Sequence, residues 1–162
     1  METGGNEGSA WTDGPLILGV PWEPSRELIA GAAGLAEGLG VHLICAFVDP
    51  SGYLAEFEPA RTRTASSIDP GTNSEALFPA ADVRSSLEAV LGAPGESWSL
   101  RVLHGSVADA LVRLADSTGA SAIVVGGPRH GARARLNRML EQSVSARLMG
   151  IQRRPVIVIP EA

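Results

Sequence analysis

The stretch SAIVVGG, residues 121–127, decides how this chain folds. It is a short, almost wholly apolar run that ends in two glycines, and such runs are typical of strands buried on both faces of a sheet. Four further runs of this kind are present in the sequence: PLILGV (15–20), VHLICAFV (41–48), SWSLRVLHG (97–105) and RPVIVIP (154–160). The chain therefore contains five candidate strands.

Between these strands, apolar residues recur every three or four positions, which predicts amphipathic helices. The helices are expected over residues 26–39, 81–91, 107–117 and 139–149. Strands that alternate with helices of this length form right-handed βαβ units, and such units build a parallel sheet. The sequence therefore predicts an α/β fold: an open five-stranded parallel sheet with helices on both faces.

Two segments depart from this alternation. Residues 1–13 are polar and rich in glycine, and we expect them to form a disordered N-terminal tail. Residues 49–79 are rich in Gly, Pro, Ser and Thr without sustained periodicity, which predicts a long flexible loop. With 162 residues and no repeat or linker, residues 14–162 are expected to form a single domain.

The composition excludes several classes of site. All 13 basic residues are arginines, so neither a Walker-type phosphate-binding lysine nor a Schiff-base lysine is available. The single cysteine, Cys45, rules out an internal disulfide and a cysteine-built metal site. The three histidines lack the spacing of metal ligands, and no triad partners are evident for Ser143. We therefore expect no metal and no catalytic set.

No apolar run approaches the roughly 18 residues of a membrane span, and the polar N-terminus does not resemble a signal peptide. We expect a cytoplasmic protein that contacts no membrane.

Charge is distributed unevenly along the chain. The net charge is −5, yet residues 126–154 carry seven arginines and one acidic residue, Glu141. The overall acidity argues against nucleic-acid binding. The local basic segment favours a small anionic ligand or an acidic protein partner.

Ligands of open parallel sheets bind outside the carboxyl ends of the strands, near the point where strand order reverses. Gly126 and Gly127 follow a strand directly and would let a ligand approach the backbone. Ser143 and Val144 lie near the start of the last helix, where free N–H groups could hold a phosphate. The basic loop 129–138 adds positive charge. The same pattern is also typical of a tight turn followed by solvent-exposed arginines, so both interpretations stay open.

The last strand is apolar, and an apolar strand at a sheet edge invites pairing with another chain. We therefore predict a homodimer through Pro155–Pro160. The alternative is that helices cover this strand.

Two segments, HGSVADALVRLADSTGASAIVVGG (104–127) and QSVSARLMGIQRRPVIVIP (142–160), resemble the universal stress protein family. The strand–helix–strand unit LILGVPWEPSRELIAGAAGLAEGLGVHLICAFV (16–48) resembles the start of that family's domain. The resemblance covers residues 15–160 apart from the long loop. It implies strand order 3-2-1-4-5, a Rossmann-like arrangement akin to the adenine nucleotide alpha hydrolases, and commonly a homodimer.

The family has two branches. One binds ATP through Gly-x2-Gly-x9-Gly-Ser/Thr after the fourth strand and an Asp at the end of the first strand; the other lacks this pattern and binds no nucleotide. Here Gly126 and Ser143 match the pattern, but Arg129 stands at the second glycine with Gly131 close by, and Gln142 precedes the serine. The spacing from Gly126 to Ser143 is also three residues longer than the pattern allows.

The resemblance places the adenine side of such a site at Val20, Pro21 and Phe47. Pro21 stands where the ATP-binding branch has its Asp, and a proline offers no side-chain acceptor for the adenine amino group. Phe47 falls near the second-strand position that packs on adenine in that branch.

These departures favour a non-catalytic stress-response or signalling module that acts as a homodimer and carries a degraded ATP motif. The alternative is an ATP-binding protein that uses Gly126, Gly127, the loop 129–138 and Ser143, at most with slow hydrolysis. An unrelated α/β enzyme would need a catalytic set that we cannot assemble from this sequence.

Overall fold

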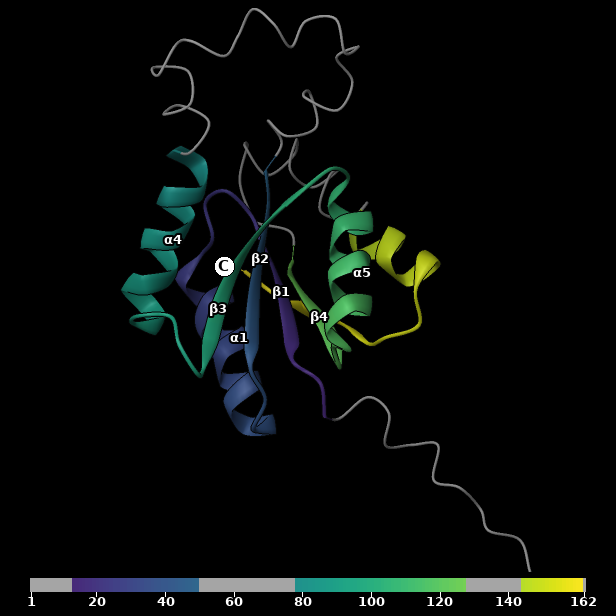
Figure 1. The fold of residues 1–162 in the computed structure, drawn as a ribbon, viewed down its shortest axis with the longest axis horizontal. Helices are drawn as coiled ribbons and strands as arrows, with labels where there is room; N and C mark the ends of the chain where they lie inside the picture. The colour runs from purple at the N-terminus through teal and green to yellow at the C-terminus, as the bar shows by residue number, and fades with distance from the viewer. Residues whose placement is uncertain (1–12, 50–77, 128–143, 162) are drawn as a thin grey trace, which may run out of the picture.

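The computed structural model describes residues 13–49, 78–127 and 144–161 (Figure 1). Its labelled elements are β1 (Leu16–Val20), α1 (Arg26–Leu39), β2 (Leu43–Asp49), α4 (Phe78–Leu91), β3 (Trp98–His104), α5 (Val107–Thr118), β4 (Ala122–Gly126) and β5 (Val156–Ile159). An unlabelled helical segment covers 144–151. Apart from Asp13, the expected tail lies outside the described residues, as does the interior of the expected loop.

The structure narrows the expected loop 49–79 at both ends. Asp49 is the last residue of β2, and α4 begins at Phe78 rather than at residue 81. Pro79 does not prevent this earlier start, because a proline is tolerated in the first turn of a helix, where its missing N–H has no partner to lose.

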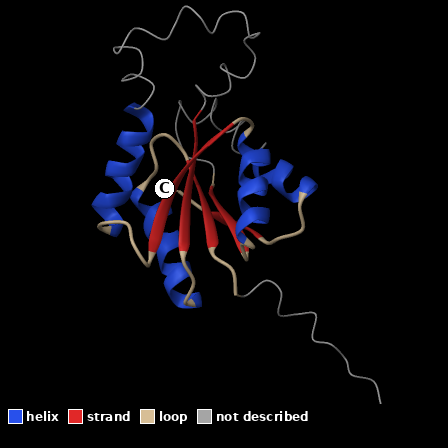
Figure 2. Ribbon diagram, viewed as in Figure 1, coloured by secondary structure: helices blue, strands red, loops and turns tan. Residues whose placement is uncertain are grey.

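The five strands form one parallel sheet in the order β3-β2-β1-β4-β5, which confirms the expected fold (Figure 2). From β1 the chain builds outward first through β2 and β3, then on the other side through β4 and β5. Strand order therefore reverses between β1 and β4. We call the carboxyl ends of these two strands, Val20 and Gly126, the switch point.

Helices cover both faces of the sheet, α1 and α4 on one and α5 with the 144–151 helix on the other (Figure 1). Alternation along the strands divides the core between these faces: Leu16 and Leu18 pack toward α1, whereas Ile17 packs toward α5. The side chains of Leu16, Ile17 and Leu18 in β1 are fully buried because the strand lies at the centre of the sheet. This explains why its sequence lacks polar alternation.

Helix α1 starts beside the switch point. The Ser25 side chain caps it by accepting a hydrogen bond from the Leu28 backbone N–H at 3.1 Å. At the other end, Gly40 adopts a left-handed conformation with φ 65° and donates its N–H to carbonyls of the last turn, Ala36 and Glu37. The expected helix bounds of 26–39 are confirmed.

The chain approaches β1 at the opposite end of the sheet. The Ser121 hydroxyl donates a hydrogen bond of 2.6 Å to the Gly14 carbonyl, and the Ser121 N–H donates one of 2.9 Å to the Pro15 carbonyl. A Cβ at Gly14 would collide with the Gly119 carbonyl oxygen, so only glycine permits this close approach. The amino end of β1 is thereby fixed to the turn before β4.

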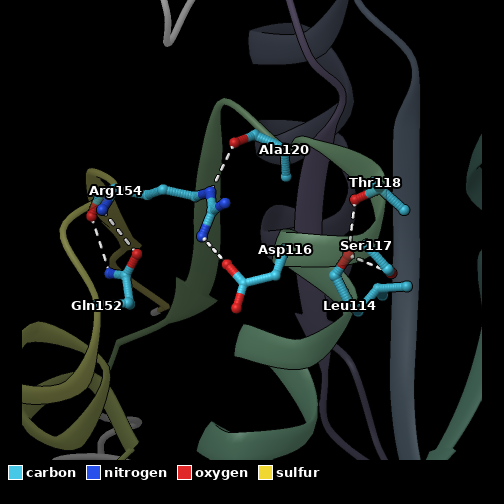
Figure 3. Close-up of polar contacts among 7 residues, drawn as sticks. All are labelled: Leu114, Asp116, Ser117, Thr118, Ala120, Gln152 and Arg154. Carbon is cyan, nitrogen blue, oxygen red and sulfur yellow. Dashed lines mark hydrogen bonds and ion pairs between the residues drawn. The ribbon is translucent and has the colours of Figure 1, made fainter.

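A polar cluster fixes the start of β5 (Figure 3). The Arg154 Nε donates to the Ala120 carbonyl at 2.9 Å, and its Nη1 pairs with the Asp116 carboxylate at 2.7 Å. The Gln152 side chain exchanges two hydrogen bonds with the Arg154 backbone, at 2.9 and 2.7 Å. One arginine thus joins β5 to the end of α5 and the start of β4.

Across the described ranges, no helix combines the length and the apolar character that crossing a membrane would require.

Candidate functional site

Three of the expected site residues meet at the carboxyl end of the sheet. Val20 ends β1, its register partner Phe47 lies near the end of β2, and Gly126 ends β4 on the other side of β1. The Val20 and Phe47 side chains are 6% and 3% exposed and belong to the core on the α1 face. Their backbones, rather than their side chains, therefore border the switch point.

The segment that leaves β1 offers an aromatic ring instead of an acid. Pro21 is half-buried, whereas the next residue, Trp22, is 53% exposed. An exposed indole has a flat face on which a planar ligand could stack. Trp22 was not among the site residues expected from the sequence.

The chain's own C-terminal residues occupy the space beside the two glycines after β4. A Cβ on Gly126 would collide with the Glu161 Oε1 and lie 3.3 Å from the Leu28 Cδ2. A Cβ on Gly127 would lie 3.2 Å from the Ile159 carbonyl oxygen and 3.3 Å from the Pro160 Cα. These contacts within the chain are sufficient to explain why both positions are glycine.

Of the remaining expected site residues, only Val144 lies within the described part of the chain. Arg129, Gly131 and Ser143, with the rest of the loop 129–138, lie outside the described residues. Val144 is described, and its side chain packs against the core on the α5 face. The structure therefore brings together the β1, β2 and β4 parts of the expected site but does not place its basic part.

An ion pair joins the 144–151 helix to the first turn of α5. The Arg147 Nη2 lies 3.0 Å from the Asp109 Oδ2, and both side chains are well exposed. Hydrogen bonds from Ser106 and from Arg147 lower the pKa of Asp109, because they favour its ionised form. This contact stabilises the fold at neutral pH and is lost as the pH falls through the lowered pKa of Asp109.

Among the described residues, Cys45 and His42 are placed unfavourably to act as a nucleophile or as a metal ligand. Burial raises the pKa of the Cys45 thiol to about 12, so it stays protonated at neutral pH. His42 bonds to the Glu96 carbonyl at 2.7 Å and to the Ser99 hydroxyl at 2.9 Å, near the amino end of the sheet. Within the described part of the chain, no three His, Cys, Asp or Glu residues are grouped as a metal site.

Two buried acids lie at the carboxyl end of the sheet. Asp49, at the end of β2, is 6% exposed, and Glu161, two residues beyond β5, is 3% exposed. Glu161 was not among the expected site residues, because its proximity to Gly126 joins residues far apart in the chain. No local pattern indicates such contacts.

Comparison with known proteins agrees with this fold. The family model of the universal stress protein family matches residues 17–160. No curated protein matches this chain in sequence.

Several solved structures share the architecture. A universal stress protein in complex with cAMP has 19% identity and a TM-score of 0.57, and the match covers 93% of this chain and 99% of that chain. A universal stress protein from Archaeoglobus fulgidus in complex with dAMP has 21% identity and a TM-score of 0.51. The match covers 91% of this chain and 98% of that chain. A protein from the universal stress protein family of Burkholderia pseudomallei has 21% identity and a TM-score of 0.55. The match covers 94% of this chain and 98% of that chain.

At these identities the solved structures show a common fold, and the family model covers most of the chain. The resemblance found in the sequence is confirmed. This chain belongs to the universal stress protein family.

Proposed function

We propose that this chain is a non-catalytic stress-response or signalling module that holds ATP weakly at its switch point. The observation that carries the proposal is the packing of Gly126 and Gly127 against Glu161, Ile159 and Pro160. In an ATP site of the implied kind, phosphate oxygens would approach the backbone at these glycines. Here the chain itself occupies that space. Pro21 also disfavours ATP binding, because its side chain cannot accept a hydrogen bond from the adenine amino group.

The test is the nucleotide content of the freshly purified protein, followed by calorimetric titration with ATP and Mg²⁺. We expect no co-purified nucleotide and binding weaker than micromolar. Bound nucleotide or micromolar affinity would overturn the proposal.

A second candidate function is tight adenine-nucleotide binding through Gly126, Gly127, the loop 129–138 and Ser143. It is favoured by the two universal stress proteins of similar fold that were crystallised with cAMP and dAMP. For this candidate, the double variant Arg129→Ala, Arg133→Ala should weaken ATP binding at least tenfold, since charge-assisted hydrogen bonds contribute about 1.5–3 kcal/mol each. Arg153→Ala is the matched control, because Arg153 is an exposed arginine near the start of β5.

We also propose that the protein is a cytoplasmic homodimer that pairs through Pro155–Pro160. The support is that β5 is an edge strand and that its Val158 is 48% exposed. An apolar edge of this kind is stabilised when a second copy covers it. The division into a tail, residues 1–13, and one domain, residues 14–162, belongs to the same proposal.

A further inference from the structure

Trp22 is a large aromatic side chain exposed to solvent at the end of the sheet where ligands of parallel sheets bind. It is 53% exposed, whereas Phe47 and Trp98 are each 3% exposed. Tryptophan side chains are highly buried on average, because each removes a large apolar area from water. About half of the Trp22 surface is thus available for contact with another molecule.

The backbone holds Trp22 beside the switch point. β1 ends at Val20 and the cap of α1 is Ser25, so residues 21–24 alone join these two fixed points. Pro21 and Pro24 lie within this short segment, and each proline ring fixes its own φ. Little backbone freedom is therefore lost when a ligand contacts Trp22, and preorganisation of this kind favours binding.

Stacking on an indole recognises the flat face of a ring and not its edge. Every nucleobase has such a face, so stacking tolerates a change of base. The identity of a base is read instead by hydrogen bonds to its edge, and the Pro21 side chain has neither a donor nor an acceptor for one. The segment after β1 thus supplies a surface for a ring without a side chain at position 21 that distinguishes one base from another.

We propose that Trp22 binds the base of a nucleoside by stacking, and that the switch point therefore accepts purine nucleosides without distinguishing adenosine from inosine. Inosine has a carbonyl oxygen where adenosine has its amino group, so this pair changes the edge of the ring and keeps its face. The inference rests on the proposed function, because it names the contact through which the site holds ATP weakly.

The experiment is a titration of the isotope-labelled full chain with adenosine, inosine and ribose, followed by NMR. The chain has three tryptophans, and the indole N–H signal that is missing from Trp22→Phe identifies Trp22. We expect adenosine and inosine to shift this signal with dissociation constants within about threefold of each other. Ribose carries no base and should leave the signal unchanged.

Two variants and a control measure the contribution of the ring, with affinities read from the backbone N–H signals of Val20 and Gly126. Trp22→Ala should weaken the binding of both nucleosides at least about fivefold, because a base–aromatic stack is lost. Trp22→Phe keeps an aromatic face and should lose less. Leu39→Ala is the matched control and should bind as the wild type does, because Leu39 is similarly exposed, 59%, at the far end of α1.

Several results would overturn the proposal. One is a folded Trp22→Ala protein that binds both nucleosides as tightly as the wild type. Others are a wild type that binds neither nucleoside, or one that binds adenosine more than about tenfold more tightly than inosine. A loss of folding in both Trp22 variants would make the ring a structural group. Weaker self-association of Trp22→Ala with unchanged nucleoside binding would place Trp22 in a contact between two copies of the chain.

This result is separable from that on the proposed function. Tight ATP binding by the wild type would refute the proposed function whatever Trp22 does. Weak ATP binding together with unchanged nucleoside affinity in Trp22→Ala would leave the proposed function standing and refute only the role of Trp22.

Discussion

Strands β3 and β5 both lie at edges of the sheet, yet they are stabilised and protected in different ways. β3 pairs with β2 over seven register positions, and its exposed residues include Arg101 and His104. β5 pairs with β4 over four positions, and its sequence VIVI contains no charge. Charged side chains on an edge strand oppose pairing with other chains, whereas an apolar edge invites it.

The starts of the two edge strands are also anchored by different contacts. At β3, Trp98 is buried, and His42 links the segment before β2 to Glu96 and Ser99. At β5, the polar contacts of Arg154 supply the anchor (Figure 3). Strand β3 is therefore held mainly by its length and packing, whereas β5 is anchored by the polar contacts of one side chain and carries an exposed apolar residue, Val158.

The largest effect is expected from a charge placed on the β5 edge. Val158→Asp should weaken self-association by roughly 100-fold or more, because an unpaired carboxylate in an interface costs several kcal/mol. The control is Val102→Asp on β3, since the two valines are similarly exposed, 48% and 43%. Sedimentation velocity over a concentration series measures the effect. A Val158→Asp protein that remains dimeric, or a Val102→Asp protein that dissociates, would reverse the comparison.

The next effect concerns the anchor of β5. Arg154→Ala should lower the free energy of unfolding by about 1–3 kcal/mol, because it leaves the buried Ala120 carbonyl without this donor. Asp116→Asn is the control and should cost less than about 1 kcal/mol, because the Asp116 side chain is 64% exposed. Urea denaturation measures both changes. Equal losses would show that the ion pair, rather than the carbonyl contact, supports β5.

A smaller effect is expected at the anchor of β3. His42→Ala should cost about 1 kcal/mol, since it removes hydrogen bonds to the Glu96 carbonyl and the Ser99 hydroxyl. The loss corresponds to a fall of roughly 2–4 °C in Tm for a protein of this size. Thermal denaturation followed by circular dichroism measures it, with Ser99→Ala to isolate one of the two bonds. A loss greater than that of Arg154→Ala would contradict the view that β3 depends less on polar anchors.

The smallest effect is expected from the substitution Trp98→Phe. The buried Nε1 of Trp98 has no hydrogen-bond partner in the described part of the chain. Trp98→Phe removes this donor but also some packing volume, and these opposing changes should leave stability within about 1 kcal/mol of the wild type. Trp98→Ala should instead cost about 3–5 kcal/mol. If the phenylalanine variant loses as much as the alanine variant, the Trp98 N–H has an essential partner.

Much of the fold could be predicted from the sequence because β1 and β4 are buried on both faces. Their runs LILGV and AIVVG are apolar throughout, and this is the pattern of central parallel strands. The order of the strands came from the family resemblance and not from periodicity. The exposure of Arg101 and Val102 on β3 results from its edge position, which a local pattern does not contain.

The candidate site was less predictable because it, too, depends on contacts that a local sequence pattern does not contain. The sequence shows that Gly126 and Gly127 need space, but it does not show what fills that space. A ligand and the chain's own Glu161 would leave the same local signal. Only the register of β5 on β4, a contact between residues about thirty positions apart, distinguishes these cases.

The close packing of Gly14 against Gly119 and Ser121 also affects where a label or a linker can be attached to the protein. The hydrogen bonds from Ser121 to the Gly14 and Pro15 carbonyls fix the first described residues of the chain at the amino end of β1. All five strands are parallel, so these residues lie at the opposite end of the sheet from Val20 and Gly126. A linker or a fluorophore attached at Asp13 is therefore carried at the amino end of the sheet, away from the carboxyl ends of β1 and β4 where the proposed ligand binding is to be tested.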